Sequence, residues 1–263
     1  MKLGVRSICV SRDFDEALRA AKAAGLQGIQ ITTREAGVFG ATDDELLQFK
    51  ARVEAAGLQI ASCGAGPNLA DPKASEQSLA QFRAILRAAA VMGHRTVTGE
   101  SKALPAGISA AQGWTTCIEN ARAICRMAEE FDVDFCIEPG GPCLIRTTED
   151  LERLLDAAGS ERLKVNFDGG NLWSAGCDAV EAARRLAAQI GHVHVKDWSR
   201  ARSAEAALGE GEVDYASILR ILRDAGYAGW LVIERERSED PLGDTARAAE
   251  RLIDLCESVR QGS

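Results

Sequence analysis

Residues 133–171 read VDFCIEPGGPCLIRTTEDLERLLDAAGSERLKVNFDGGN, and this stretch decides the fold. It opens and closes with a short, mostly apolar run, at 133–138 and at 163–168, and each run stops at a carboxylate followed by Pro or Gly. Between them, the leucines of 148–158 recur at three- and four-residue steps, which is typical of an amphipathic helix. Strand, helix and strand in this order predict a parallel βαβ unit.

The same alternation fills the rest of the chain. Strands are predicted at 3–8, 28–31, 58–63, 95–98, 133–138, 163–168, 190–195 and 229–234. Helices are predicted at about 14–24, 43–56, 75–92, 112–131, 148–158, 178–188, 214–224 and 244–260. No linker rich in Pro, Gly or Ser interrupts the series, so eight units predict a single-domain (β/α)8 barrel, the TIM barrel, over residues 1–263. A doubly wound open sheet is the rival fold, but no GxGxxG follows the first strand to favour it.

The amino-acid composition narrows the classes of partner that this protein can bind. The chain has 31 basic and 39 acidic residues and a net charge of -8, and such a surface repels nucleic-acid phosphates and anionic lipid head groups. Its N-terminal segment is interrupted by charge too soon for a signal peptide, and no apolar stretch reaches membrane-spanning length. The eight cysteines form no CxxC pair, so we expect reduced, buried thiols in a cytoplasmic protein. Homo-oligomerisation stays open.

Four neighbouring strands each end on, or carry near their end, a side chain that binds metals. These residues are Glu138, Asp168, His194 and Glu234. Because the carboxyl ends of barrel strands meet at one mouth, we expect the four side chains to converge there. Three carboxylates and one imidazole suit one divalent ion, with Mn²⁺, Mg²⁺ or Co²⁺ fitting best and Zn²⁺ less well. Burying these carboxylates without a cation would cost much free energy, which argues against a purely structural role.

At these residues the chain resembles the xylose isomerase-like barrels, a sugar phosphate isomerase/epimerase group that includes ketose 3-epimerases, hydroxypyruvate isomerases, inosose dehydratases and endonuclease IV. The resemblance is strongest in CIEPGG (136–141), VNFDGGNL (165–172), GHVHVKDW (191–198) and the segment 208–236. It implies the same four metal ligands, with the two glutamates, Glu138 and Glu234, acting as acid and base on opposite faces of a substrate carbon.

That chemistry implies an enediolate. A metal that chelates a hydroxyl and a carbonyl oxygen acidifies the C–H between them, and a carboxylate moves the proton. Two departures weaken a ketose 3-epimerase assignment in particular: Asn171 stands where many relatives have a substrate-contacting histidine, and residues 139–144 lack the acid that epimerases carry there.

Further residues are predicted to contact substrate. Lys196 shares the inward face of its strand with His194, with an ion pair to Asp197 as the alternative interpretation. The other candidates are Asn171, Glu100, Arg6 and two tryptophans expected in loops after strands four and seven, Trp114 and Trp198. His192 is expected to be a core histidine that supports the site, and His94 to be structural.

The sequence therefore predicts a metal-dependent isomerase or epimerase acting on a small sugar, keto-sugar or related hydroxycarbonyl compound. A dehydratase acting on a keto-inositol or 3-keto sugar is the main alternative, because it uses the same intermediate. An abasic-site endonuclease conflicts with the acidic charge and with only three histidines. A non-catalytic sugar-binding protein conflicts with the complete ligand set.

Overall fold

The structure, a computed structural model, describes residues 1–64 and 66–262 and contains one closed barrel of eight parallel strands. The predicted (β/α)8 fold with a single domain is confirmed. The strands are β1 (Lys2–Arg6), β2 (Gly28–Thr32), β3 (Gln59–Gly64), β4 (Thr96–Glu100), β5 (Asp134–Glu138), β6 (Leu163–Asp168), β7 (Ile190–Val195) and β10 (Trp230–Ile233). They close in the order β1-β10-β7-β6-β5-β4-β3-β2.

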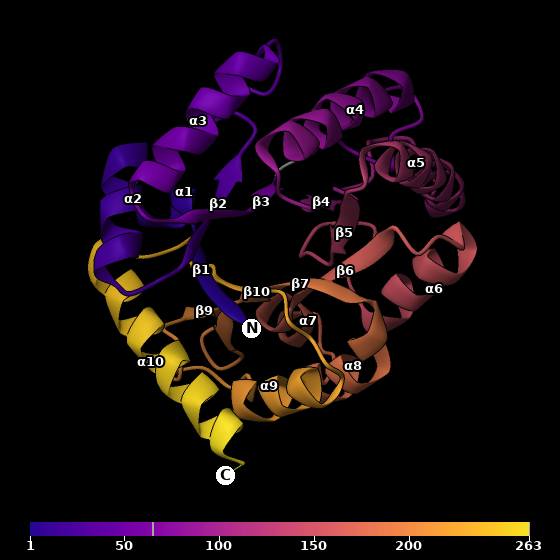
Figure 1. The fold of residues 1–263 in the computed structure, drawn as a ribbon. Coiled ribbons are helices and arrows are strands. Elements are labelled where there is room, and N and C mark those ends of the chain that lie inside the picture. The colour runs from indigo at the N-terminus through magenta and orange to yellow at the C-terminus, as the bar shows by residue number, and fades with distance from the viewer. Residues whose placement is uncertain (65, 263) are drawn as a thin grey trace.

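Helices form a ring around these strands (Figure 1). The ring contains α2 (Phe14–Ala23), α3 (Asp43–Ala55), α4 (Ser75–Met92), α5 (Ala110–Phe131), α6 (Thr148–Ala158), α8 (Ala179–Leu186), α9 (Tyr215–Asp224) and α10 (Pro241–Gln261). The last helix, α10, packs beside the first long one, α2, so both ends of the chain close the same side of the ring (Figure 1).

Polar caps set where these helices begin. Thr42 and Thr147 each form a reciprocal capping box with the residue three positions later, as their sequence motifs predict. The predicted start of the last helix, at about residue 244, is late, because α10 begins at Pro241. Its cap is Asp240, whose carboxylate accepts from the Gly243 amide, and Pro241 takes the first helical position, where a missing N–H costs nothing.

Several short elements follow the strands and were not predicted. The first strand stops at Arg6 rather than at residue 8, because the chain turns there into α1 (Ser7–Val10). The others are α7 (Gly169–Ser174), the 3-10 turn η1 (Ala187–Gln189) and the antiparallel pair β8 (Asp197–Ser199) and β9 (Ala204–Ala206). Elements of three to six residues carry too little periodicity to be read from a sequence.

The hydrophobic core lies mainly between the barrel and the helices. Phe82 of α4 meets Phe135 of β5 edge to face, with 5.1 Å between ring centroids, and Phe167 of β6 is also fully buried. All eight cysteines are free thiols, seven of them buried, as expected. Within the described residues, no helix is both long and apolar enough to cross a bilayer.

Candidate metal centre and active site

The four predicted ligands meet at the carboxyl end of the barrel. Glu138 ends β5, Asp168 ends β6, His194 lies one residue before the end of β7, and Glu234 directly follows β10. Those strands are consecutive in the barrel. Each ligand is at most 6% exposed, and one ligand atom from each lies within 4.8 Å of the other three. The sequence therefore predicted this convergence correctly.

His194 stands between the two glutamates. Its Nδ1 lies 3.2 Å from Glu138 Oε2 and 3.2 Å from Glu234 Oε2. The two carboxylates come from the outer pair of the four strands, β5 and β10, with β6 and β7 between them. Both contact the same nitrogen of the imidazole.

Lys196 lies inside the cluster. Its Nζ is 2.8 Å from Glu234 Oε2, 3.3 Å from Asp168 Oδ2 and 4.0 Å from Glu205 Oε1. The alternative interpretation, an ion pair with Asp197, is wrong. Side chains alternate along an extended chain, so Lys196 points inward with His194, whereas Asp197 points the other way.

Burial and neighbouring charge shift the pKa values of the cluster in different directions. Burial raises the pKa of Asp168 to about 7, against the opposing effect of Lys196. Burial would lower the pKa of His194, but Glu138 and Glu234 raise it to about 10. Burial also opposes ionisation of Glu234, yet His194 and Lys196 hold its pKa well below its usual range. The cluster thus balances its carboxylates with cations of its own.

Asp197 organises the segment that follows β7, residues 198–213. Its buried carboxylate accepts hydrogen bonds from the backbone amides of Trp198, Gly209, Gly211 and Val213, at 2.8 to 3.2 Å. A Cβ on Gly211 would lie 2.1 Å from Asp197 Oδ1, so this position has no room for a side chain. These bonds fold the LGEGEV segment back onto β8.

Two asparagines hold Glu138 in place. Asn171 Nδ2 donates to Glu138 Oε1 at 3.1 Å, and Asn166 Nδ2 donates to Glu138 Oε2 at 2.8 Å. Asn171 also receives a 3.4 Å hydrogen bond from Lys196 at its Oδ1. The side-chain amide of Asn171, predicted to contact substrate, is therefore already used to position a ligand and a lysine.

Arg6 and Glu100 lie at the mouth, as predicted. The Arg6 guanidinium pairs with Glu234 and, at 2.8 Å, with Glu236. Glu100 ends β4 beside Glu138 and pairs with Lys102 at 2.7 Å. Arg6, Glu100 and Lys102 line one small cavity together with Glu138 and His194, so this cavity is the candidate substrate site.

The two tryptophans lie differently from expectation. Trp114 does not lie in a loop: it is the fifth residue of α5, buried, with the Arg153 guanidinium 4.0 Å from the centroid of its ring. The polar segment before it contributes the helix cap, Ser109, which starts α5 earlier than the predicted residue 112. Trp198 lies in β8, after strand seven as expected, half-buried against the core.

Sequence reasoning missed Gln30 and Asn166. Both are polar residues inside buried strands, β2 and β6, and both point into the barrel. The signal existed for Asn166, which shares the inward parity of Asp168. His192 is buried inside the barrel, as expected, and its ring contacts Gln30 at 3.0 Å and Ser62 at 3.3 Å. His94 is buried outside the ligand cluster, also as expected.

The donor set fits a metal ion. Asp168 Oδ2 and Glu234 Oε2 are buried oxygens whose charged partner is the single ammonium of Lys196, at 3.3 Å and 2.8 Å. Buried carboxylates are costly unless cations compensate them, and a divalent ion would add the positive charge that three carboxylates need. Three carboxylates and one imidazole nitrogen within one small space provide hard and borderline ligands for a divalent ion.

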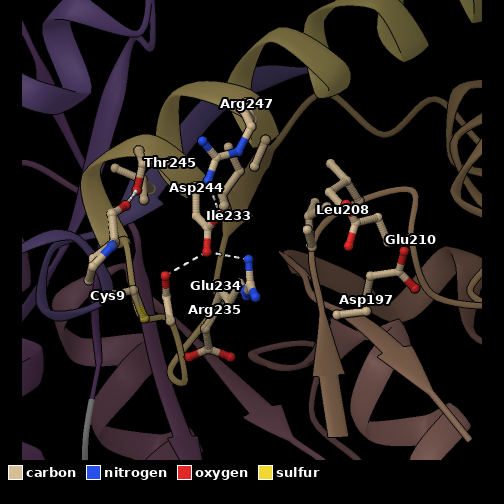
Figure 2. A pocket seen from close by; sticks show the side chains of 17 residues that line it. Cys9, Asp197, Leu208, Glu210, Ile233, Glu234, Arg235, Asp244, Thr245 and Arg247 are labelled. Atoms are coloured by element: carbon tan, nitrogen blue, oxygen red, sulfur yellow. Dashed lines mark hydrogen bonds and ion pairs between the residues drawn. The ribbon is translucent and has the colours of Figure 1, made fainter. Parts of the chain in front are cut away.

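A second cavity lies behind Glu234, between β10, the start of α10 and the segment after β9 (Figure 2). Ile233 and Arg235 face it, because they alternate with the inward-pointing Glu234. Its polar residues pair with one another: Asp244 contacts Arg235, Arg247 and Ser238, as the dashed lines in Figure 2 mark in part. Of the four ligands, Glu234 also lines this cavity.

Fold and site together define a (β/α)8 barrel with a metal-capable centre at its carboxyl end. The sequence pattern of the xylose isomerase-like TIM barrel family matches residues 18–255. The chain belongs to this family.

Among curated proteins, an inosose dehydratase from Clostridium perfringens is 26% identical over 145 residues, which cover 49% of this chain and 48% of that protein. The chain thus matches about half the length of this curated relative. Among solved structures, a D-psicose 3-epimerase from Clostridium cellulolyticum H10 aligns with a TM-score of 0.81, at 20% identity over 98% of this chain and 99% of that one. A mannonate dehydratase from Streptococcus suis aligns with a TM-score of 0.84, at 20% identity over 100% and 94%. The two structural likenesses show the fold.

Proposed function

We propose that this protein is a divalent-metal-dependent isomerase or epimerase acting on a small sugar, keto-sugar or related hydroxycarbonyl compound. The observation that carries the proposal is the contact of Glu138 and Glu234, which come from two different strands, with His194 Nδ1, 3.2 Å each, with Asp168 in the same cluster. Glu138, Asp168, His194 and Glu234 would hold the ion, which we propose to be Mn²⁺, Mg²⁺ or Co²⁺.

When bound, the ion would supply Lewis acidity to a substrate carbonyl and so acidify the neighbouring C–H. One glutamate, Glu138 or Glu234, takes that proton and leaves an enediolate. The other glutamate returns a proton, to the opposite face of the same carbon for epimerisation or to the adjacent carbon for isomerisation. The flanking positions of β5 and β10 support this division of roles between the two carboxylates.

Side chains at the mouth of the barrel would provide the remaining contacts with the substrate. Arg6 and the Glu100–Lys102 pair line the cavity above the ligands. Arg6 and Lys102 can donate hydrogen bonds to hydroxyl and carbonyl oxygens, and Glu100 can accept them from hydroxyl groups. Lys196, inside the cluster, places an ammonium where negative charge on an enediolate oxygen would need it. We propose a small, polyhydroxylated substrate because this cavity is lined mainly by charged and polar groups.

The test is turnover of a panel of ketoses, keto-inositols and 3-keto sugars in D2O by protein loaded with Mn²⁺ or Mg²⁺. Isomerisation or epimerisation incorporates solvent deuterium at carbon and retains the formula otherwise, which NMR and mass spectrometry detect together. Turnover that is unchanged by removing the metal with a chelator would contradict the proposal.

A dehydratase is the second candidate, and Lys196 favours it. Elimination of water needs a base for the proton beside the carbonyl and a donor for the departing β-hydroxyl, and Lys196 adds a donor 2.8 Å from the Glu234 base. Similarity to an inosose dehydratase supports the same assignment. In the same D2O experiment, a product lighter by one water identifies the dehydratase.

A further inference from the structure

Two histidines converge on one amide oxygen below the ligand cluster. Gln30 Oε1 lies 2.9 Å from His194 Nε2 and 3.0 Å from His192 Nε2. Gln30 comes from β2, across the barrel from β7, and all three side chains are at most 1% exposed. Water does not compete for these contacts, so the amide and the rings satisfy one another.

The chemistry of a carbonyl oxygen fixes the proton positions. An amide oxygen accepts hydrogen bonds and donates none, so each histidine that contacts it must carry its proton on Nε2. For His194 this leaves Nδ1 as the nitrogen that faces Glu138 and Glu234. For His192 it leaves Nδ1 without a hydrogen, and that atom has no hydrogen-bond partner among the described residues.

The surroundings orient the Gln30 amide. Its Nε2 lies 3.5 Å from Thr98 Oγ1, which directs the amide oxygen toward the histidines. Gly64 leaves the space that this orientation needs: a Cβ there would lie 2.7 Å from Gln30 Nε2 and 3.0 Å from Thr98 Oγ1. The barrel therefore has a place built for this amide.

We infer that Gln30 is a positioning residue that accepts a hydrogen bond from His194 Nε2 and so holds Nδ1 toward Glu138 and Glu234, as the nitrogen through which His194 would bind the metal. The inference rests on the metal-binding part of the proposed function. Without this acceptor, the ring loses the hydrogen bond that fixes its orientation, and Nδ1 is no longer held in the ligand cluster. Partners of this kind set the tautomer of metal-binding histidines in general.

The test compares two substitutions of similar size. Gln30→Met removes the acceptor, whereas Gln30→Glu keeps an oxygen acceptor at the same reach. We expect the Kd for Mn²⁺, measured by EPR of the free ion, to rise on the order of 10- to 100-fold in Gln30→Met. In Gln30→Glu it stays within a few-fold of wild type or falls. Ser62→Ala, which changes a contact of His192 in the same layer, is the matched control and keeps the wild-type Kd.

A second readout does not depend on either variant folding. In wild-type protein labelled with 15N-histidine and loaded with Zn²⁺, the His194 ring carries its proton on Nε2 and binds the metal through Nδ1. A protonated Nδ1, or an equal Kd for Gln30→Met and wild type, overturns the inference. If wild-type protein binds no divalent ion, the proposed function fails instead, so the two failures are distinguishable.

Discussion

Lys196 Nζ lies 2.8 Å from Glu234 Oε2, and its other close carboxylate oxygen, Asp168 Oδ2, belongs to a second proposed metal ligand. A protein cation thus contacts two of the proposed ligands. This placement supplies positive charge to buried carboxylates that would otherwise be left uncompensated. It also predicts that lysine and metal stabilise the same charges.

Lys196→Met is expected to destabilise the metal-free protein more than the metal-loaded one. Removing one partner of a buried ion pair costs about 3–5 kcal/mol, and a bound ion offsets part of that loss. Urea unfolding with EDTA and with saturating Mn²⁺ measures both values. Lys102→Met is the control, because its partially exposed pair with Glu100 contributes about 1 kcal/mol or less. Equal losses for Lys196→Met in both conditions would contradict this account.

Asp197→Asn is expected to loosen the segment that follows β7, residues 198–213. The carboxylate accepts four backbone hydrogen bonds, and an amide in its place keeps one acceptor oxygen and introduces an N–H that faces other donors. We expect a stability loss of about 2 kcal/mol and faster hydrogen exchange over 198–213. Asp178→Asn, at the exposed cap of α8, should change neither. Unchanged exchange in the Asp197 variant would show that other contacts hold this segment.

We expect the free energy of unfolding to fall as the pH drops below neutral, because His94 takes up a proton more readily in the unfolded chain than in the folded protein. Burial lowers the pKa of His94 to about 4, below the ordinary value of 6.5 that applies in the unfolded chain. Between these values the unfolded chain binds a proton that the folded protein does not, so the free energy of unfolding falls as the pH falls. From pH 7.5 to pH 5, wild type should lose about 2 kcal/mol more than His94→Gln. Parallel pH profiles for the two proteins would exclude this role.

The fold was predictable because each barrel strand is a short buried run, and each helix carries a clear apolar face. The β8–β9 pair was not, because its strands are three residues long and its conformation depends on Asp197 contacting amides up to sixteen residues away. The last helix begins at Pro241 rather than at about residue 244. Its start is set by the Asp240 cap, a local hydrogen bond that the apolar pattern of the helix does not show.

The ligand set was predictable because strand ends and inward parity are properties of the sequence. The ion-pair partners of Lys196 could not be predicted, because only closure of the barrel decides which carboxylates lie within reach of its ammonium. Trp114 was expected in a loop although it falls within the predicted helix 112–131, and the structure places it in α5, one turn after the Ser109 cap. Gln30 was missed because a single glutamine in an apolar strand has no pattern of its own; its role arises from contact with His192 and His194 across the barrel.

The most direct test of the central claim is the metal content of purified Glu234→Gln protein against Glu236→Gln. Both residues contact Arg6, but only Glu234 belongs to the ligand cluster, while Glu236 is half exposed. We predict that Glu234→Gln loses most of its divalent metal while its circular dichroism spectrum stays that of the folded barrel, and that Glu236→Gln keeps wild-type occupancy. Full metal occupancy in folded Glu234→Gln protein would contradict a metal centre built on these four side chains.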